Sequence, residues 1–389
     1  MHTGQLVFKQ LMDFFPKADF TRSLRRYRGH YHFRGFSCFD QFLAMAFAQL
    51  TARRSLRDIA ACLGAMQPKL YHAGFRSRVF RSTLADANER RDWRIFADTA
   101  QVLITRARRL YAGEDFGATL DETAYVLDST TIDLCLSLFP WARYKRRQAA
   151  VKLHTLMDLR GSIPCFVRVS DGKMHDVEIL DELLFEPGAF YIMDRGYISF
   201  ERLWRLAQSA AWFVIRSRKK LVHTTLSHAP VDKTTGLRSD HPIRLAGVDT
   251  TGDYPAPLRR VVFFDAETRR RFVFLTNNVE LSALTIAQLY KCRWAVELFF
   301  KWIKQHLRIE AFFGTSENAV KTQVWIAISV YVLVAIVKKE LKIERPLSEI
   351  LQILSISLFE KVLMRQALTT IPPENATTAF RNSLPLFDL

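Results

Sequence analysis

In the first third of the chain, apolar residues recur every three or four positions, which is the spacing of amphipathic helices. The pattern predicts a helix over residues 39–50, entered through Ser37. A second helix is expected after Ser55, because Ser55 and Asp58 have the spacing of a capping box. A third is expected over residues 93–110. The N-terminal part is therefore predicted to be helical.

Beyond residue 120, short apolar runs replace this pattern. Strands are expected at residues 125–127, 132–136, 150–157, 165–169, 190–193 and 212–215, and helices at 176–184 and 200–210. Strands that alternate with helices are typical of an α/β fold, with a mixed sheet flanked by helices.

The next stretch differs from both. Residues 223–253 are polar, and two apolar strands are expected after them, at 261–264 and 272–275. These features predict a β-rich insertion. A long helical pattern then begins at Ser282 and runs to about Leu307.

The apolar run 324–337 could suggest a membrane segment. Its 14 residues are too few to cross a bilayer as a helix, which needs about 20. A buried helix is therefore expected. Residues 371–389 contain three prolines and are expected to form a loose tail.

These patterns divide the chain into five segments. They are a helical N-terminal domain, the first part of an α/β core, the β-rich insertion, the second part of the core, and a C-terminal helical segment with the tail. Their expected limits are residues 1–115, 116–217, 218–281, 282–345 and 346–389.

The charge of the chain points to a polyanionic partner. It contains 56 Lys and Arg against 39 Asp and Glu, a formal net charge of +17. Residues 1–120 alone hold 20 basic and 10 acidic side chains. Lys and Arg attract phosphates and release their counterions, so contact with DNA is expected, in part through the N-terminal helices. A membrane surface is disfavoured because no single amphipathic helix gathers the basic residues.

Cysteine usage and the N-terminus indicate the compartment. The five cysteines include no C-x-x-C pair, which argues against a disulfide framework and a zinc ribbon. The first 15 residues lack the apolar core of a signal peptide. A cytoplasmic, nucleoid-associated protein is expected.

Two aspartates follow apolar strands directly. Asp128 comes after the strand 125–127, and Asp194 after the strand 190–193. Carboxylates at strand ends project from the edge of a sheet, where α/β enzymes commonly hold their active sites. Since Asp also ends strands as a turn residue, neither position is decisive alone.

A charged stripe interrupts an apolar helical stretch at residues 290–304. Tyr290, Arg293, Glu297 and Lys304 have spacings of three, four and seven, which place them on one helix face. A solvated Glu–Arg pair would explain part of the stripe. The apolar neighbours favour bound partners instead: a metal ion for Glu297, and phosphate oxygens for the other three.

Three carboxylates from separate elements suit two Mg²⁺ ions, with Mn²⁺ as a substitute, because hard divalent cations prefer oxygen ligands. Two such ions can activate an attacking oxygen and stabilise a leaving one at phosphorus. The candidate metal ligands are Asp128, Asp194 and Glu297.

The stripe matches Y-x2-R-x3-E-x6-K at all four positions, and this signature resembles that of bacterial insertion-sequence transposases of family four. Asp128 in LDST and Asp194 in DRGY are similar to the family's two catalytic aspartates. The resemblance implies a ribonuclease-H-like core interrupted by a β-rich insertion. It also implies binding of double-stranded DNA, both terminal inverted repeats and target, a homodimeric synaptic complex, and cut-and-paste transposition through a DNA hairpin.

Three further residues are candidates for DNA contact. Phe272 falls where the family places an insertion-domain tryptophan that stacks on a flipped base, although a buried strand explains it equally. Lys152 and His154 share one strand face and could contact DNA, or could hydrogen-bond to position neighbouring loops.

Two alternative functions stay open. A nuclease of the same fold would hydrolyse DNA without joining ends. A DNA-binding protein derived from a transposase would lack catalysis, but all three carboxylates are present.

Overall fold

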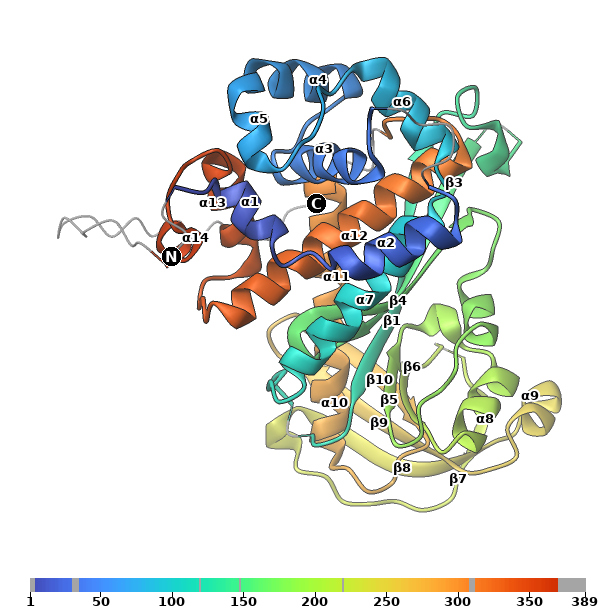
Figure 1. Ribbon diagram of the computed structural model, residues 1–389. Helices are drawn as coiled ribbons and strands as arrows, with labels where there is room; N and C mark the ends of the chain where they lie inside the picture. Colours follow the sequence, from blue (N-terminus) through green and yellow to red (C-terminus); the bar gives the residue numbers. More distant parts are fainter. Residues whose placement is uncertain are drawn as a thin grey trace.

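The computed structural model describes residues 4–29, 35–118, 120–146, 148–218, 220–307 and 312–369. The described residues before 112 form the helices α1 Val7–Met12, α2 Lys17–Arg26, α3 Cys38–Leu50, α4 Leu56–Ala65, α5 Gln67–Ala73, α6 Arg81–Arg90 and α7 Arg94–Tyr111 (Figure 1). Ser37 and Asp40 form the capping box of α3, and the Ser55 hydroxyl accepts from the Asp58 N–H at the start of α4. The three helices predicted in this region are confirmed.

The core sheet follows. Its strands are β1 Ala124–Leu134, β3 Gln148–Asp158, β4 Ile163–Asp171, β5 Phe190–Met193 and β6 Trp212–Arg216, with the short β2 Arg143–Lys145 beside β3. The spatial order is β4-β3-β1-β5-β6, in which β3 is antiparallel to both neighbours and β1, β5 and β6 are parallel. This arrangement is the ribonuclease-H-like sheet expected from the sequence.

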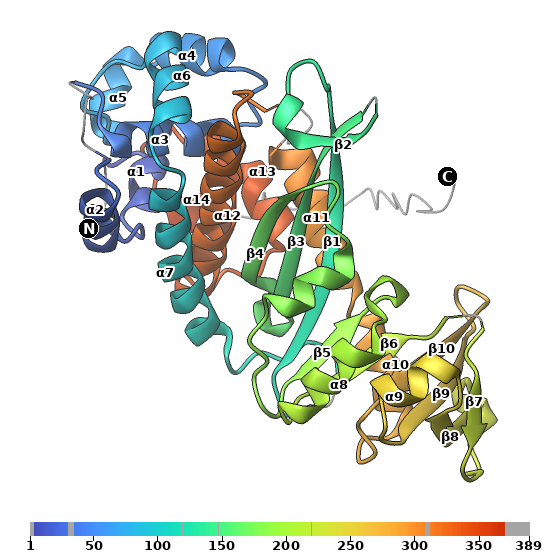
Figure 2. The ribbon, with the colours of Figure 1, turned by 90° about the vertical axis from the view of Figure 1, so that its right-hand side faces the viewer.

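The insertion extends this sheet rather than forming a separate one. It contributes β7 His223–Thr225, β8 Leu237–Leu245, β9 Leu258–Asp265 and β10 Arg270–Thr276, with the short helix α9 Val248–Asp253. Strand β10 pairs antiparallel with β6, and the order continues β9-β8-β7. Strands β9 and β10 were expected, whereas β7 and β8 lie in the polar stretch and were not. Figure 2 shows this part of the sheet at the end away from the N-terminal helices.

Helices cover both faces of the core sheet. Besides α9, the helices that follow α7 are α8 Phe200–Gln208, α10 Ala283–Lys291, α11 Trp294–Leu307, α12 Glu317–Glu340, α13 Leu347–Ser357 and α14 Met364–Thr369. Helix α8 packs on β6, α11 on β1, and α7 and α12 on β4, whereas α13 and α14 pack against other helices. Strand alternation separates two apolar clusters. Val126 and Ile192 join the cluster that contains α7 and α12, whereas Leu127 and Met193 join the one that contains α8.

Helix α12 is long and apolar enough to cross a membrane, but 94% of its apolar window is buried inside the protein. It is therefore the central core helix, as expected for the run 324–337. The N-terminal helices share its apolar cluster, and the Val7 N–H donates to the Glu360 carbonyl at 3.0 Å. The two ends of the described chain thus pack together, and the division into domains remains a proposal.

Three local predictions were wrong. The expected strands 125–127 and 132–136 are one strand, because β1 stays paired with β3 through Leu134. The helix expected at 176–184 is a shorter 3-10 segment, η3 Asp176–Asp181. The long helix from Ser282 is broken between α10 and α11 at Cys292 and Arg293, where i→i−3 hydrogen bonds tighten the turn. The expected tail lies outside the described residues.

Candidate active site

Two carboxylates meet at one edge of the sheet. Strands β1 and β5 run parallel, with Leu127 paired to Met193, so Asp128 and Asp194 both follow the last parallel pair. Asp194 leaves β5 and begins the 3-10 turn η4, Arg195–Tyr197. Asp128 lies inside the longer β1, not at its end. The two aspartates therefore lie beside each other at the ends of paired segments, as expected, although β1 continues beyond Asp128.

The signature residues connect these aspartates to Glu297. The Tyr290 hydroxyl donates to Asp194 Oδ1 at 3.0 Å. Arg293 Nη1 donates to Asp128 Oδ2 at 2.6 Å, and its Nη2 donates to Glu297 Oε1. The break between α10 and α11 places Tyr290 at the end of one helix and Glu297 at the start of the next. Two donors thus bring three carboxylates into one polar site.

Burial raises the pKa of two side chains at this site, Asp128 and Tyr290. It raises the pKa of Asp128 to about 6, against the lowering effect of the Arg293 charge. Burial also raises the pKa of Tyr290 to about 12, and the negative charge of Asp194 adds to this shift. Tyr290 therefore stays protonated at neutral pH and can act as a hydrogen-bond donor.

The ligand chemistry fits a divalent cation, since three carboxylates from β1, β5 and α11 face one site. Their present side-chain positions do not form a ready-made centre. Among the described residues, no three His, Cys, Asp or Glu side chains are grouped closely enough to hold a metal ion. The Arg293 guanidinium lies between Asp128 and Glu297 and supplies the positive charge there.

Comparison with known proteins identifies the family. The model of the Transposase DDE domain family matches residues 119–333, which include the whole core sheet, the insertion and α11. This chain is a DDE transposase. Residues 3–76 match a second family, a domain of unknown function (DUF4372), which covers the helices before α6.

Named relatives agree with this assignment. A Sinorhizobium fredii protein named as transposase y4zB is 32% identical over 72% of this chain and 77% of its own length. A Geobacillus stearothermophilus protein named as a transposase for insertion sequence element IS5377 is 36% identical over 54% of this chain and 55% of its own length. Both names are those of transposases, and the second name refers to an insertion sequence element.

Among solved structures, a piggyBac transposase synaptic complex with hairpin DNA has a TM-score of 0.49 and 10% identity, over 95% of this chain and 86% of that chain.

The remaining signature residue, Lys304, and Phe272 lie on the elements that carry the site of the transposase or pair with them. Lys304 lies on α11, two turns beyond Glu297, and is half-buried. Phe272 is half-buried on β10, with its ring centroid 6.1 Å from that of Tyr290. The Arg216 guanidinium lies 5.3 Å from the Phe272 ring centroid. An exposed base platform and a partly buried strand residue both fit this position.

The two β3 candidates have different surroundings. His154 is 0% exposed, and its Nε2 is 3.0 Å from the Ser170 hydroxyl. This burial argues against direct contact between His154 and DNA. It favours the alternative, in which His154 hydrogen-bonds to position neighbouring loops. Lys152 is half-buried and donates to the Met174 carbonyl and to Asp176.

Sequence reasoning missed Ser129, Asp176 and Tyr197 as parts of this region. Ser129 contacts Asp128 through its N–H, and Asp176 binds the Ser129 hydroxyl. The only available signals were adjacency to Asp128 for Ser129 and the position of Tyr197 in the DRGY segment.

Proposed function

We propose that this transposase cuts and rejoins transposon ends with Asp128, Asp194 and Glu297 as ligands of two Mg²⁺ ions, for which Mn²⁺ can substitute. The observation that carries the proposal is the connection of all three carboxylates by Tyr290 and Arg293 at one edge of the core sheet. When bound, the ions would activate the attacking oxygen and stabilise the leaving oxygen at phosphorus.

The signature donors would then orient the DNA. Arg293 pairs with Asp128 and Glu297, and Lys304 lies two turns beyond Glu297 on α11. Both cations would bind phosphate oxygens near the scissile bond, which fixes in-line geometry. Tyr290 would hold Asp194 through its protonated hydroxyl. Asp128, whose pKa is raised to about 6 by burial, is ionised and able to act as a ligand at neutral pH and above.

The wider reaction follows from the family resemblance. The chain would bind terminal inverted repeats, with its basic N-terminal helices contributing, and would act as a homodimer in a synaptic complex. Cut-and-paste transposition through a hairpin would use Phe272 as a platform for a flipped base. The expected place of action is the bacterial cytoplasm at the nucleoid.

The test replaces each carboxylate separately by alanine. Cleavage of a terminal-repeat DNA in Mg²⁺ or Mn²⁺ should be abolished, while DNA-end binding should change little, because Lys and Arg contacts supply most of the affinity. Normal cleavage by any of the three variants would refute the assignment.

A joining assay with labelled donor and target DNA separates transposition from hydrolysis. A transposase joins the freed 3′-OH to the target, whereas a nuclease leaves only cut donor. Absence of both reactions, with DNA binding intact, would favour the non-catalytic alternative.

A further inference from the structure

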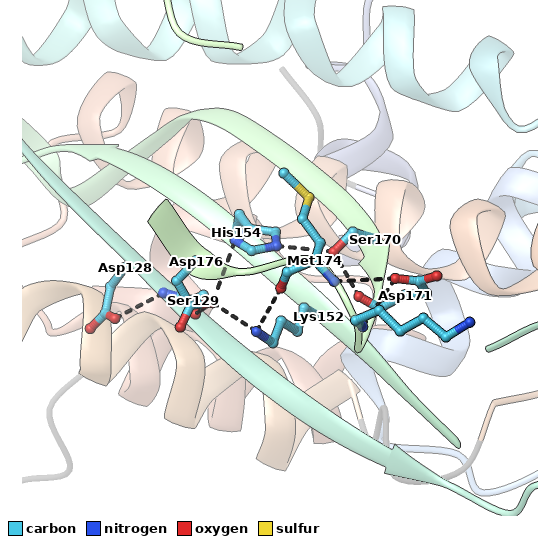
Figure 3. Close-up of polar contacts among 9 residues, drawn as sticks. Asp128, Ser129, Lys152, His154, Ser170, Asp171, Met174 and Asp176 are labelled. Carbon is cyan, nitrogen blue, oxygen red and sulfur yellow. Dashed lines mark hydrogen bonds and ion pairs between the residues drawn. The ribbon is translucent and has the colours of Figure 1, made fainter. Parts of the chain in front are cut away.

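A second polar cluster lies behind the aspartate edge, on the other face of the sheet. Successive strand residues point to opposite faces, so Ser129 faces away from the side on which Asp128 meets α11. Ser129 is paired across β1 and β3 with His154, and Lys152 lies two residues before His154 on the same face. Figure 3 shows these side chains gathered around Asp176, the first residue of η3.

Asp176 is the centre of this cluster. Its Oδ1 accepts from the Ser129 hydroxyl at 2.7 Å and from Lys152 Nζ at 3.1 Å. Lys152 Nζ also donates to the Met174 carbonyl at 2.8 Å, which ties the loop before η3 to β3. Asp171 shapes the same loop by accepting from the Lys173 and Met174 N–H groups. One carboxylate thus connects β1, β3 and η3.

The positive charge of this cluster is largely removed from water, whereas the Asp176 side chain is 36% exposed. The Lys152 side chain is only 14% exposed, and a charge with so little solvent requires a paired counter-charge. His154 Nδ1 lies 3.9 Å from Asp176 Oδ1, with no hydrogen-bond partner in the described part of the chain. Asp176 therefore balances the lysine and faces the histidine.

Ser129 transmits this arrangement to the active site. Its hydroxyl binds Asp176, while its N–H donates to Asp128 Oδ1 at 2.8 Å. The segment after Asp194 also reaches this cluster, because η4 packs against η3 and its Tyr197 is buried. Burial and then the charges of Asp128 and Asp176 raise the pKa of Tyr197. Asp176 therefore lies close to the segments that carry both aspartates.

We propose that Asp176 is a positioning residue for the cleavage reaction: through Ser129 it fixes the orientation of Asp128, and Lys152 holds Asp176 in place. The proposal rests on the proposed function, because Asp128 must be a metal ligand for its orientation to matter. Groups that orient metal ligands typically change metal affinity by 10–100-fold when removed.

The experiment compares Asp176→Ala with a matched control, Asp181→Ala, in the full-length protein bound to a terminal-repeat DNA. Asp181 lies in the same 3-10 segment, but its partners are Arg202, at 2.7 Å, and Arg205, on α8. Mn²⁺ binding to the complex is followed by electron paramagnetic resonance, together with cleavage kinetics and melting. Asp176→Ala should weaken Mn²⁺ binding by at least about tenfold and lower kcat without changing DNA affinity. Asp181→Ala should affect melting alone.

Two further variants test the route through Ser129. Ser129→Ala removes one hydroxyl and should reproduce the weaker Mn²⁺ binding, and the double variant with Asp176→Ala should be no weaker than Asp176→Ala alone. Asp176→Asn keeps the size and one acceptor oxygen, so it should fall between wild type and Asp176→Ala, and it serves if the alanine variant does not fold.

Wild-type Mn²⁺ binding in folded Asp176→Ala or Asp176→Asn would overturn the proposal, as would independent, multiplying effects of the Ser129 and Asp176 substitutions. Asp128→Ala, measured alongside, separates the two hypotheses. If it retains Mn²⁺ binding and cleavage, the proposed function itself fails; if it loses both while the Asp176 variants are normal, only the positioning role fails.

Discussion

Replacing Arg293 by alanine should make the DNA-free transposase bind Mn²⁺ more tightly, even as it impairs cleavage. The guanidinium donates to both Asp128 and Glu297. A cation that uses these two carboxylates must first displace it. When DNA is bound, a phosphate can pair with the guanidinium and free the two carboxylates. The wild-type protein should therefore bind Mn²⁺ more tightly with DNA than without it.

The size of the effect follows from these hydrogen bonds. A hydrogen bond to a charged group contributes roughly 1.5–3 kcal/mol. Losing one such contact on metal binding therefore weakens binding by roughly 10–100-fold, at about 1.4 kcal/mol per factor of ten. Arg293→Ala should strengthen DNA-free Mn²⁺ binding by about this factor. Cleavage should fall because the phosphate loses its bidentate partner.

Protonation of Asp128 opposes the gain in Mn²⁺ affinity, because a proton and the metal ion compete for the same carboxylate. Arg293 lowers the pKa of Asp128, which burial raises to about 6, so its removal raises that pKa further. The Mn²⁺ titration should therefore be made at pH 8, where Asp128 is mostly ionised in the wild type and protons compete least with the metal. At pH 6 the gain in Mn²⁺ affinity should shrink.

The assay is a Mn²⁺ titration by calorimetry or electron paramagnetic resonance, with and without terminal-repeat DNA. Arg202→Ala is the control, because it removes an arginine–aspartate pair elsewhere on the protein and should leave Mn²⁺ binding unchanged. Unchanged or weaker Mn²⁺ binding by folded, DNA-free Arg293→Ala at pH 8 would show that the guanidinium does not compete with the metal.

Three other predictions concern single side chains. Burial lowers the pKa of His154 to about 4, so the unfolded chain takes up a proton near pH 6.5 that the folded chain does not, and stability falls as pH drops through this window. His154→Gln should remove about 2 kcal/mol of the stability difference between pH 7 and pH 5 in urea unfolding, and an unchanged difference would contradict the assignment. Phe272→Ala should leave first-strand nicking normal and slow hairpin formation, whereas failure of all steps with a collapsed melting temperature would indicate a packing role. Lys304→Ala should reduce cleavage more than DNA affinity, and a loss of thermal stability alone would mark a structural lysine.

Much of this fold could be predicted locally. Apolar periodicity placed α3, α7, β3 and β5 close to their observed bounds, because burial of one face is recorded in the spacing of neighbouring residues. The spacing of Tyr290, Arg293 and Glu297 likewise indicated a shared site, and the structure connects these side chains with the two aspartates.

The tertiary structure decided the contacts between distant segments. Helical periodicity does not distinguish a continuous helix from one broken by a tight turn, so the junction at Arg293, which lets Tyr290 and Arg293 reach different aspartates, was not foreseen. The contact between Ser129 and Asp176 joins residues 47 positions apart. A local sequence pattern indicates which face of an element is buried, but not which distant side chain packs against that face. The distant partner is determined only when the sheet assembles, because the polar groups buried by the sheet must then find hydrogen-bond partners.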